Sequence, residues 1–442
     1  MSDTSVETPV TILTGSLGAG KTTLLNQLLA ESDDRSIAVL VNDMGELNVD
    51  ADLIAEQSAL TESNDAVAEL SNGCICCELR DDLERAVVRL ASDYSFDHLV
   101  VEPSGISEPA PVARLFTGGS SAAARYQVDA VVAVVDASQF VEIVDEGNIS
   151  DDEILKENAV DNTEVDEQPL SSLLVEQVEF ADVVVINKID LVDNKRQADV
   201  TEIVETLRPD AKILTTTYSE VNPGILFNIN RFDPATAAER AGWKQILNTA
   251  HDENPDENTK HSMEDTHDQS HLRADSNHVH DHGHAHPADK YGINSFSYRR
   301  RRPFHPSRIA AVLSDLPASV IRSKGHLWVA GRETAQLTFS QAGPSATISV
   351  TGRWIASLPE FEQNAYRNNR SELEFEWDDE WGDRRTGLVF IGRDIDSEAL
   401  IAQLDDAVVT DTEFEASRSL SGLERFPTDP DEELVLAGPT VN

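Results

Sequence analysis

Basic residues, cysteines and long apolar runs are all scarce in this chain of 442 residues, and each shortage excludes a class of protein. Only 35 Lys and Arg stand against 80 Asp and Glu, which gives a net charge of -45. A nucleic-acid-binding surface needs a basic footprint, so we expect no nucleic-acid partner. No apolar run reaches the roughly 18 residues of a membrane-spanning helix, and the first residues lack a secretory signal. These absences predict a cytoplasmic protein with no membrane partner.

The three cysteines are too few and too closely spaced for a disulfide framework, which predicts a reduced environment. The excess acid is spread along the whole chain and does not form one block. It could bind cations or keep the protein soluble in concentrated salt, and the even spread favours a salt-adapted, halophilic protein. On that interpretation most carboxylates are solvated surface groups without site chemistry.

Residues 15–22, GSLGAGKT, match the phosphate-loop pattern G-x-x-x-x-G-K-[ST]. They follow an apolar, strand-like run at 10–14 and precede a helical pattern at 22–29, which argues against a chance Gly-rich turn. Backbone N–H groups of such a loop surround phosphate oxygens, aided by the helix N-terminus. Lys21 would reach the β- and γ-phosphates and Thr22 would ligate Mg²⁺. The expected phosphate-binding residues are Gly15, Gly18, Ala19, Gly20, Lys21, Thr22 and Thr23.

A second motif, N-K-x-D, is formed by Asn187, Lys188 and Asp190 after an apolar run at 181–186. The Asp190 carboxylate can accept two hydrogen bonds from the N1–H and 2-amino groups of guanine. Adenine lacks this donor pair, so the motif favours GTP over ATP. A four-residue match can also be a polar turn at a strand end, but its position after a phosphate loop supports the guanine interpretation.

Between these motifs, an apolar run at 99–102 ends in Glu102 and is followed by Gly105. An acid at this point can contact Mg²⁺ directly or through water, although a strand can also end in Glu by chance. The Gly105 backbone N–H could approach the γ-phosphate. Lys21, Thr22 and Glu102 are therefore the candidate catalytic residues of a GTPase. No obvious Gln or Arg is placed to activate water, which predicts slow intrinsic hydrolysis.

Short apolar runs alternate with helical patterns between residues 10 and 217. This predicts an α/β fold, a P-loop NTPase parallel sheet with helices on both faces. The expected strands are residues 10–14, 37–42, 99–102, 130–135, 183–187 and 212–216. The expected helices are residues 22–29, 79–90, 109–115, 170–180 and 197–207.

Changes in composition divide the chain into four parts. Residues 1–240 are expected to form the GTPase domain, with an acidic insertion at about 145–169. Residues 241–290 hold nine of the twelve histidines and predict a His/Asp-rich disordered linker. Residues 291–405 predict a smaller C-terminal α+β domain, and 406–442 an acidic, frayed tail. The expected C-terminal strands are 293–298, 320–329, 336–339, 346–350 and 386–391, with helices at 306–316 and 398–404.

All cysteines lie in one cluster, Cys74, Cys76 and Cys77. Thiolates suit Zn²⁺, Cu(I) and Co²⁺, and three core thiols so close together are an unlikely packing accident. No second C-x-x-C completes a structural zinc site, so the site would keep an open position for a metal meant to leave. Glu46, in a segment where the first switch loop of a GTPase should lie, could add an oxygen ligand. The alternative is a solvated loop acid in so acidic a chain.

Residues 278–286 alternate histidine with small or acidic residues. Alternate residues of an extended chain share a side, so several imidazoles could surround one metal ion. The tract predicts a low-affinity metal store or acquisition arm, unless it is only a solvated linker. The candidate ligands are His278, His280, His282, His284 and His286.

Taken together these residues resemble the CobW-like family of P-loop GTPases. The resemblance rests on residues 15–23, 42–46, 70–77 with C-x-C-C, 102–105 and 187–190, and residues 293–404 look like the family's C-terminal domain. It implies a GTP-hydrolysing metallochaperone that delivers zinc or cobalt to a client metalloprotein or to cobalamin synthesis. It also implies Cys76, Cys77 and Glu46 as metal contacts. Some relatives carry an acid where this chain has Val41, so a ligand at that position is absent.

We therefore expect a switch in which GTP and Mg²⁺ order the segment around Glu46 and so change metal affinity. Hydrolysis would alter the site and hand the metal to a client, and a homodimer is left open. Two other interpretations remain. One is a metal-buffering or storage protein with incidental GTPase activity, and the other is a redox-sensing regulatory GTPase.

Overall fold

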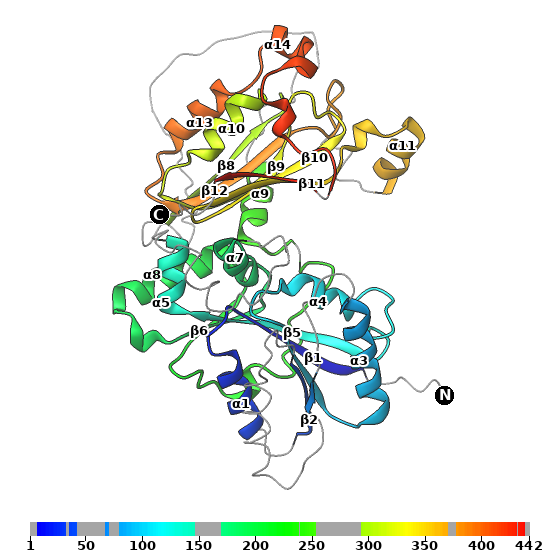
Figure 1. The fold of residues 1–442 in the computed structure, drawn as a ribbon, viewed down its shortest axis with the longest axis vertical. Helices are drawn as coiled ribbons and strands as arrows, with labels where there is room; N and C mark the ends of the chain where they lie inside the picture. Colours follow the sequence, from blue (N-terminus) through cyan, green and yellow to red (C-terminus); the bar gives the residue numbers. More distant parts are fainter. Residues whose placement is uncertain are drawn as a thin grey trace, which may run out of the picture.

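The computed structural model describes residues 7–31, 35–41, 67–69, 79–145, 169–237, 239–252, 293–369, 377–430 and 432–437. Two sheets, each with its own helices, lie one above the other along the long axis (Figure 1). The lower, blue-to-green part holds the phosphate-loop segment, and the upper, yellow-to-red part is the C-terminal domain. Within these ranges no helix has both the length and the apolarity to cross a bilayer.

Across the described residues the first sheet has seven strands in the order β3-β2-β4-β1-β5-β6-β7, and all of its pairings are parallel. The strands are β1 (Thr8–Thr14), β2 (Ile37–Val41), β3 (Val67–Glu69), β4 (His98–Glu102), β5 (Tyr126–Asp136), β6 (Val183–Asn187) and β7 (Lys212–Thr215). Their central runs of Val, Ile, Leu and Ala are buried, as a sheet covered on both faces requires. The expected parallel sheet is confirmed, and short β3 is an addition that no apolar run predicted.

Helices cover both faces of this sheet because successive side chains of a strand point to opposite sides. Val10 and Ile12 of β1 join one core, while Leu13 joins the core on the other face. On the Leu13 side lies α1 (Lys21–Ala30). The remaining elements of this part are α3 (Leu79–Asp93), α4 (Pro109–Leu115), α5 (Ala137–Phe140), the π-helical turn η1 (Val141–Asp145), α7 (Leu170–Phe180), α8 (Asn194–Leu207), and the short 3-10 turns η2 (Ile189–Leu191) and η3 (Pro223–Ile225).

The C-terminal domain is built on an antiparallel sheet, in the order β13-β11-β10-β9-β12-β8 for the described part of the chain. The strands are β8 (Ile293–Arg300), β9 (Val320–Leu327), β10 (Ala335–Ala342), β11 (Ser345–Arg353), β12 (Thr386–Arg393) and β13 (Glu433–Ala437). On one face α10 (Pro306–Ser314) and α13 (Ser397–Asp406) share a core with it, and α11 (Glu360–Asn369) lies outside that core. The expected α+β domain is confirmed.

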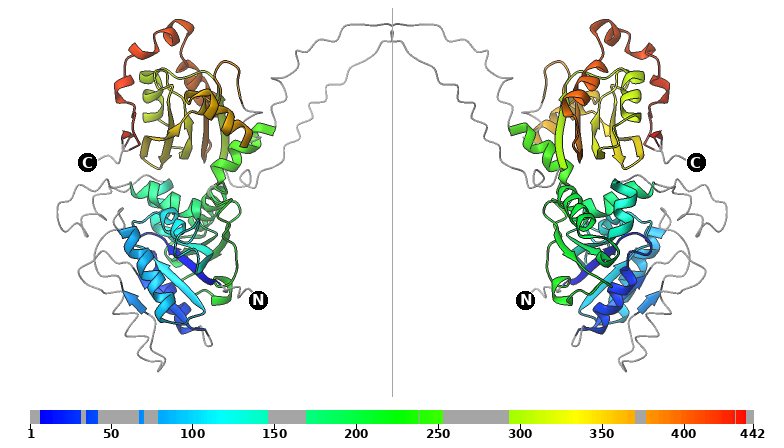
Figure 2. Two further views of the ribbon diagram at one scale, coloured as in Figure 1. Left: turned by 90° about the vertical axis from the view of Figure 1, so that its right-hand side faces the viewer. Right: turned by 90° about the vertical axis from the view of Figure 1, so that its left-hand side faces the viewer.

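The predicted linker was wrong at its start. Residues 242–252 form α9 (Gly242–Asp252), which packs against β8, β9 and β12. Figure 2 shows α9 in green at the junction of the two parts. Trp243 and Leu247 pack an apolar stripe of α9 against the core at that junction, and this burial stabilises the helix. The prediction missed it because the segment as a whole is polar in composition. The remaining residues of the predicted linker, 253–290, and residues 146–168 of the predicted insertion lie outside the described residues.

The predicted frayed tail was wrong as well. After α13 the chain forms α14 (Asp411–Glu415), and β13 pairs antiparallel with β11, with Glu433 opposite Ser349. Backbone pairing at the sheet edge outweighs the acidic composition of this segment. One sequence signal was present: Thr410 and Glu413 form a capping box, T-x-x-E, at the start of α14.

The run of four arginines, 299–302, is integrated into this domain. Arg300 forms an ion pair with Asp405, and Arg302 pairs with Asp411. Two of the four arginines thus pair with surrounding acid, as a basic run in an acidic chain is expected to do.

Candidate functional site

The phosphate loop connects β1 to α1, and its glycines take backbone angles that other residues avoid. Gly15, Gly18 and Gly20 all have positive φ. A Cβ at Gly20 would lie 2.4 Å from Nδ2 of Asn187, so this position admits no side chain. Thr23 is exposed on the first turn of α1. The loop therefore has the backbone geometry of a phosphate cradle at a helix N-terminus.

Lys21, the first residue of α1, folds back over this loop. Its Nζ donates to the carbonyl oxygens of Gly15 at 2.9 Å and Ser16 at 3.0 Å, and the side chain is buried. The ammonium is thus held inside the ring of backbone groups where phosphate oxygens would bind. Its hydrogen bonds to the loop fix its position before any nucleotide arrives.

Thr22 and Glu102 are brought together from α1 and the end of β4. The Thr22 hydroxyl donates to Oε1 of Glu102 at 3.5 Å, and Glu102 is 5% exposed. A hydroxyl and a carboxylate beside a phosphate cradle are the hard oxygen ligands that Mg²⁺ prefers. The donor set therefore fits Mg²⁺.

The N-K-x-D segment lies against the phosphate loop. Asn187 is buried at the end of β6, where its Nδ2 donates to the carbonyl of Ala19 at 2.9 Å and its Oδ1 accepts from the N–H of Ser219 at 2.9 Å. Asn187 thus joins the phosphate loop to the loop after β7. Asp190 lies on the exposed first turn of η2, open to a base.

Two residues of this site, Asp136 and Ser219, were not found from the sequence, and Asp136 pairs with Lys188 of the N-K-x-D segment. Lys188, with φ of 58°, places its Nζ 2.7 Å from Oδ2 of Asp136 at the end of β5. Burial opposes ionisation of Asp136, but hydrogen bonds from Lys188 and Ser138 outweigh it and lower the pKa. The Oγ of Ser219 donates to the carbonyl of Gly20 at 3.1 Å. An acid ending the buried run at 130–136 was the available signal for Asp136, whereas nothing local marked Ser219.

Gly105 lies where the loop after β4 touches the phosphate loop. A Cβ at this position would lie 2.8 Å from the backbone N of Leu17 and 3.2 Å from Nζ of Lys21. Only a glycine allows this close approach. The loop is held from behind by Gln177 of α7, whose Nε2 donates to the carbonyls of Gly105 at 3.2 Å and Ser107 at 3.4 Å.

The candidate metal ligands Glu46, Cys74, Cys76, Cys77, His278, His280, His282, His284 and His286 lie outside the described residues. Within those ranges, no group of three or more His, Cys, Asp or Glu side chains could hold a metal ion. The strands that lead to two of these segments are placed, however. Val41, the last residue of β2, is in register with Glu69 of β3 on one side and Glu102 of β4 on the other.

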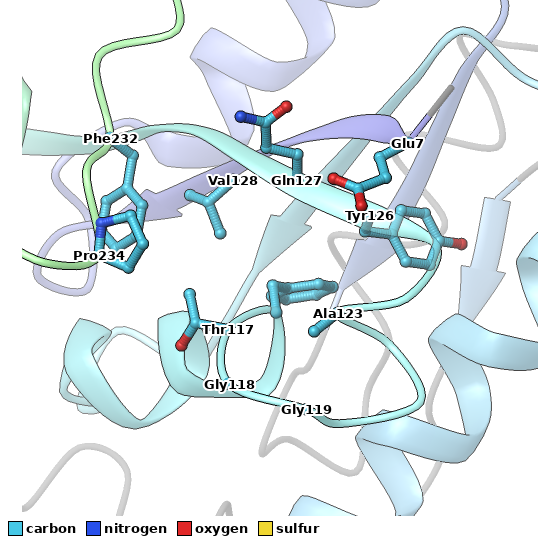
Figure 3. A pocket seen from close by; sticks show the side chains of 11 residues that line it. Glu7, Thr117, Gly118, Gly119, Ala123, Tyr126, Gln127, Val128, Phe232 and Pro234 are labelled. Atoms are coloured by element: carbon cyan, nitrogen blue, oxygen red, sulfur yellow. The ribbon is translucent and has the colours of Figure 1, made fainter. Parts of the chain in front are cut away.

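A pocket of about 330 Å³ lies at the opposite end of the first sheet. In Figure 3 Phe232 and Pro234 lie on one side of it, and Glu7 and Tyr126 on the other. Glu7 immediately precedes β1 and Tyr126 begins β5, so the pocket lies at the amino ends of these strands. Ligands of open parallel sheets bind at the carboxyl ends, and this pocket is therefore separate from the phosphate site.

Comparison with known families finds two matches. A model described as the CobW/HypB/UreG nucleotide-binding domain matches residues 9–215. A model described as the cobalamin synthesis protein cobW C-terminal domain matches residues 293–408. The first interval contains the phosphate loop and the N-K-x-D segment, and the second contains most of the antiparallel sheet.

Similar proteins carry related names. The chain is 35% identical over 444 residues to zinc-regulated GTPase metalloprotein activator 1 of Dictyostelium discoideum, covering 96% of this chain and 85% of that protein. It is 32% identical over 228 residues to zinc chaperone YjiA of Escherichia coli, covering 50% of this chain and 62% of that protein. The solved structure of Zn(II)-bound YjiA GTPase from E. coli aligns with 91% of this chain and 100% of that chain, at 21% identity and a TM-score of 0.37.

Proposed function

The chain belongs to the CobW family of P-loop GTPases and is itself a GTPase, and we propose that it uses GTP to control the binding and delivery of zinc to a client metalloprotein. One observation carries the proposal. The register of β2 with β3 and β4 brings Val41, Glu69 and Glu102 side by side at the carboxyl edge of the sheet. The segment containing Glu46 therefore follows a strand that ends beside the carboxylate proposed to contact Mg²⁺, and the cysteine segment follows the next strand, β3.

The nucleotide roles follow from the geometry around the phosphate loop. Lys21 would bind the β- and γ-phosphate oxygens, and Asp190 would accept from the guanine edge. Thr22 and Glu102 would hold Mg²⁺, which neutralises charge on the phosphates. In hydrolysis a water oxygen bonds to the γ-phosphorus while the bond to the β–γ bridging oxygen breaks, releasing GDP and phosphate. Lys21 would stabilise the charge that develops on these oxygens.

The metal roles are proposed for the segments that follow β2 and β3. Cys76 and Cys77 would bind the ion as thiolates, with Glu46 as the oxygen ligand and Cys74 as a further candidate. In the sequence, Cys74 is five residues beyond Glu69, the last residue of β3. The five histidines of the 278–286 tract would collect metal at lower affinity. Two similar proteins named for zinc favour zinc over cobalt as the cargo.

The nucleotide and the metal would be coupled through this sheet edge. If the γ-phosphate changes zinc affinity, zinc must change GTP affinity by the same factor. Hydrolysis then removes the interaction that held the switch segment, and zinc passes to the client. The same arrangement would serve a homodimer or a monomer, since the strand ends at Val41, Glu69 and Glu102 all belong to one chain.

The test measures the zinc affinity of the reduced protein against a chromophoric chelator, with a non-hydrolysable GTP analogue and then with GDP. We expect a difference of about tenfold or more, lost in Cys76→Ala, and the same titration of Cys74→Ala shows whether this further candidate also binds the ion. Repeating the titration with Co²⁺ shows which metal responds to the nucleotide.

Equal affinities in both nucleotide states would contradict the gating and leave a metal buffer. In that case Lys21→Ala, which removes the phosphate contact, leaves metal binding unchanged. Nucleotide binding that responds to oxidation of the cysteines in the absence of metal would instead identify a redox-sensing GTPase.

A further inference from the structure

We propose that helix α7 mechanically couples the Gly105 loop to the C-terminal sheet, with Gln177 as the residue that positions the loop. This inference rests on the proposed approach of Gly105 to the γ-phosphate. It adds a connection between the nucleotide site and the C-terminal domain. The contacts at both ends of the connection are made by neighbouring residues of one helix, Glu176, Gln177 and Glu179.

At the nucleotide end, Gln177 is 1% exposed and its amide donates to two carbonyls of the same loop. The two acceptors, Gly105 and Ser107, belong to the loop whose Gly105 N–H would approach the γ-phosphate. A buried amide that gives both of its hydrogens to one loop resists any movement of that loop, because each abandoned partner costs a desolvated polar group. Movement of the loop must therefore draw α7 with it or break these bonds.

At the other end, Glu179 and Arg322 form a buried two-pronged ion pair. Nε and NH2 of Arg322 lie 2.8 Å and 3.0 Å from the two carboxylate oxygens of Glu179, and the Arg322 side chain is fully buried. Arg322 also donates to Ser340 and to the carbonyl of Gln341. Such a pair, once buried, is costly to separate, so β9 and β10 are tied to α7.

A second, half-buried pair strengthens this end. Lys324 of β9 lies 3.2 Å from Glu176, and its ammonium is 5.8 Å from the centre of the Trp243 ring of α9. Residues three apart on a helix share a face, so Glu176 and Glu179 both reach the C-terminal sheet. Gln177, about 100° round the helix from Glu176, reaches the nucleotide loop. One rigid helix thus contacts both domains with different faces.

The apolar surroundings make this junction continuous. Leu173, Leu174 and Val178 of α7 belong to one core with Ile321 and Ala342 of the C-terminal sheet. A packed core transmits displacement because it has few voids to absorb it. The state of the γ-phosphate should therefore alter β9 and β10, and a protein docked on the C-terminal domain should in turn alter GTP hydrolysis.

The test uses hydrogen exchange of the full-length, metal-free, reduced protein, with a non-hydrolysable GTP analogue or with GDP. We expect peptides covering residues 320–342 to differ in exchange between the two nucleotides. Gln177→Met keeps the side-chain volume but removes both hydrogen bonds, and it should abolish this difference. The same variant should hydrolyse GTP about fivefold more slowly in single turnover, with GDP affinity changed less than twofold.

Gln363→Met is the matched control. Gln363 also donates its amide to two backbone carbonyls, of Ala356 and Leu358, but it lies on α11, away from α7. It should preserve the nucleotide-dependent exchange. Lys324→Met is a second test, because it cuts one link to β9 without touching either nucleotide loop, and it should reduce the difference.

Persistence of the full exchange difference in Gln177→Met would overturn the proposal, as would identical exchange of wild-type residues 320–342 with both nucleotides bound. Neither result depends on metal. A failure of zinc gating would leave the coupling through α7 standing, and a failure of the coupling would leave zinc gating to be judged by its own titration.

Discussion

Replacing Asn187 by alanine tests how far the nucleotide site depends on contacts between distant segments. The amide of Asn187 donates to Ala19 in the phosphate loop and accepts from Ser219 in the loop after β7, both at 2.9 Å. With 2% of its surface exposed, Asn187 has no solvent to replace these bonds in the folded state. The substitution therefore leaves one carbonyl and one N–H without their partner.

Each abandoned buried partner costs about 1–3 kcal/mol. We expect about half of the total, about 2 kcal/mol, to appear as weaker nucleotide binding, because the two loops then no longer form one rigid cradle. That energy corresponds to about a thirtyfold increase in Kd. The rest should appear as a lower free energy of unfolding of the nucleotide-binding domain.

The assay is a fluorescence titration with a labelled GDP, run beside thermal denaturation. Asn222→Ala is the control, because the exposed Asn222 lies in the same loop as Ser219 but only caps η3, accepting one hydrogen bond from the N–H of Gly224. It should leave the Kd unchanged. A change of less than threefold in Asn187→Ala, or an equal change in the control, would refute the view that Asn187 joins the two loops.

Three further outcomes are expected. Burial, aided by the charge of Arg35, lowers the pKa of His98 from 6.5 to about 4. As the pH falls from 6.5 to 4 the unfolded state takes up this proton before the folded state does, so the free energy of unfolding declines by about 3 kcal/mol. In urea denaturation across this pH range, His98→Gln should show a smaller decline. Arg322→Met should lower the free energy of unfolding by about 3–5 kcal/mol because it leaves Glu179 buried and unpaired, and adding Glu179→Met should recover most of the loss in denaturant titrations. Asp190→Asn exchanges a guanine-matching acceptor for an amide that can donate to the 2-oxo group of xanthine, so competition binding should show preference shifting from GTP to xanthosine triphosphate.

Local patterns predicted the elements of this protein well where each element carries its own signal. Residues 183–187, 109–115 and 170–180 were expected as a strand and two helices, and β6, α4 and α7 have those bounds. Continuous apolar runs and helical periodicity are properties of single segments. The predictions of a linker at α9 and of a frayed tail at β13 were wrong because both elements are stabilised by distant strands. Helix α9 packs against β8 and β12, and β13 pairs with β11.

The candidate site divides in the same way. Lys21, Thr22, Glu102 and Asn187 were recognisable because their motifs are short and contiguous. Asp136 and Gln177 were not recognised, because each contacts a partner far along the chain. Asp136 pairs with Lys188, and Gln177 donates to the carbonyl of Gly105. Gln177 has no local pattern that distinguishes it from a surface residue, and the one local signal for Asp136 is its place at the end of a buried run.

By itself, the sequence determined that the chain has a phosphate loop, a guanine motif, a cysteine cluster and two domains of different class. Those features are set by residue order and by periods of a few residues. Only the tertiary structure decided that Asn187 meets Ala19, that Gln177 holds the Gly105 loop and that Glu179 pairs with Arg322, across separations of 168, 72 and 143 positions. Such contacts follow from strand order and from helix packing on the sheet, which bring distant segments together and which no single segment encodes.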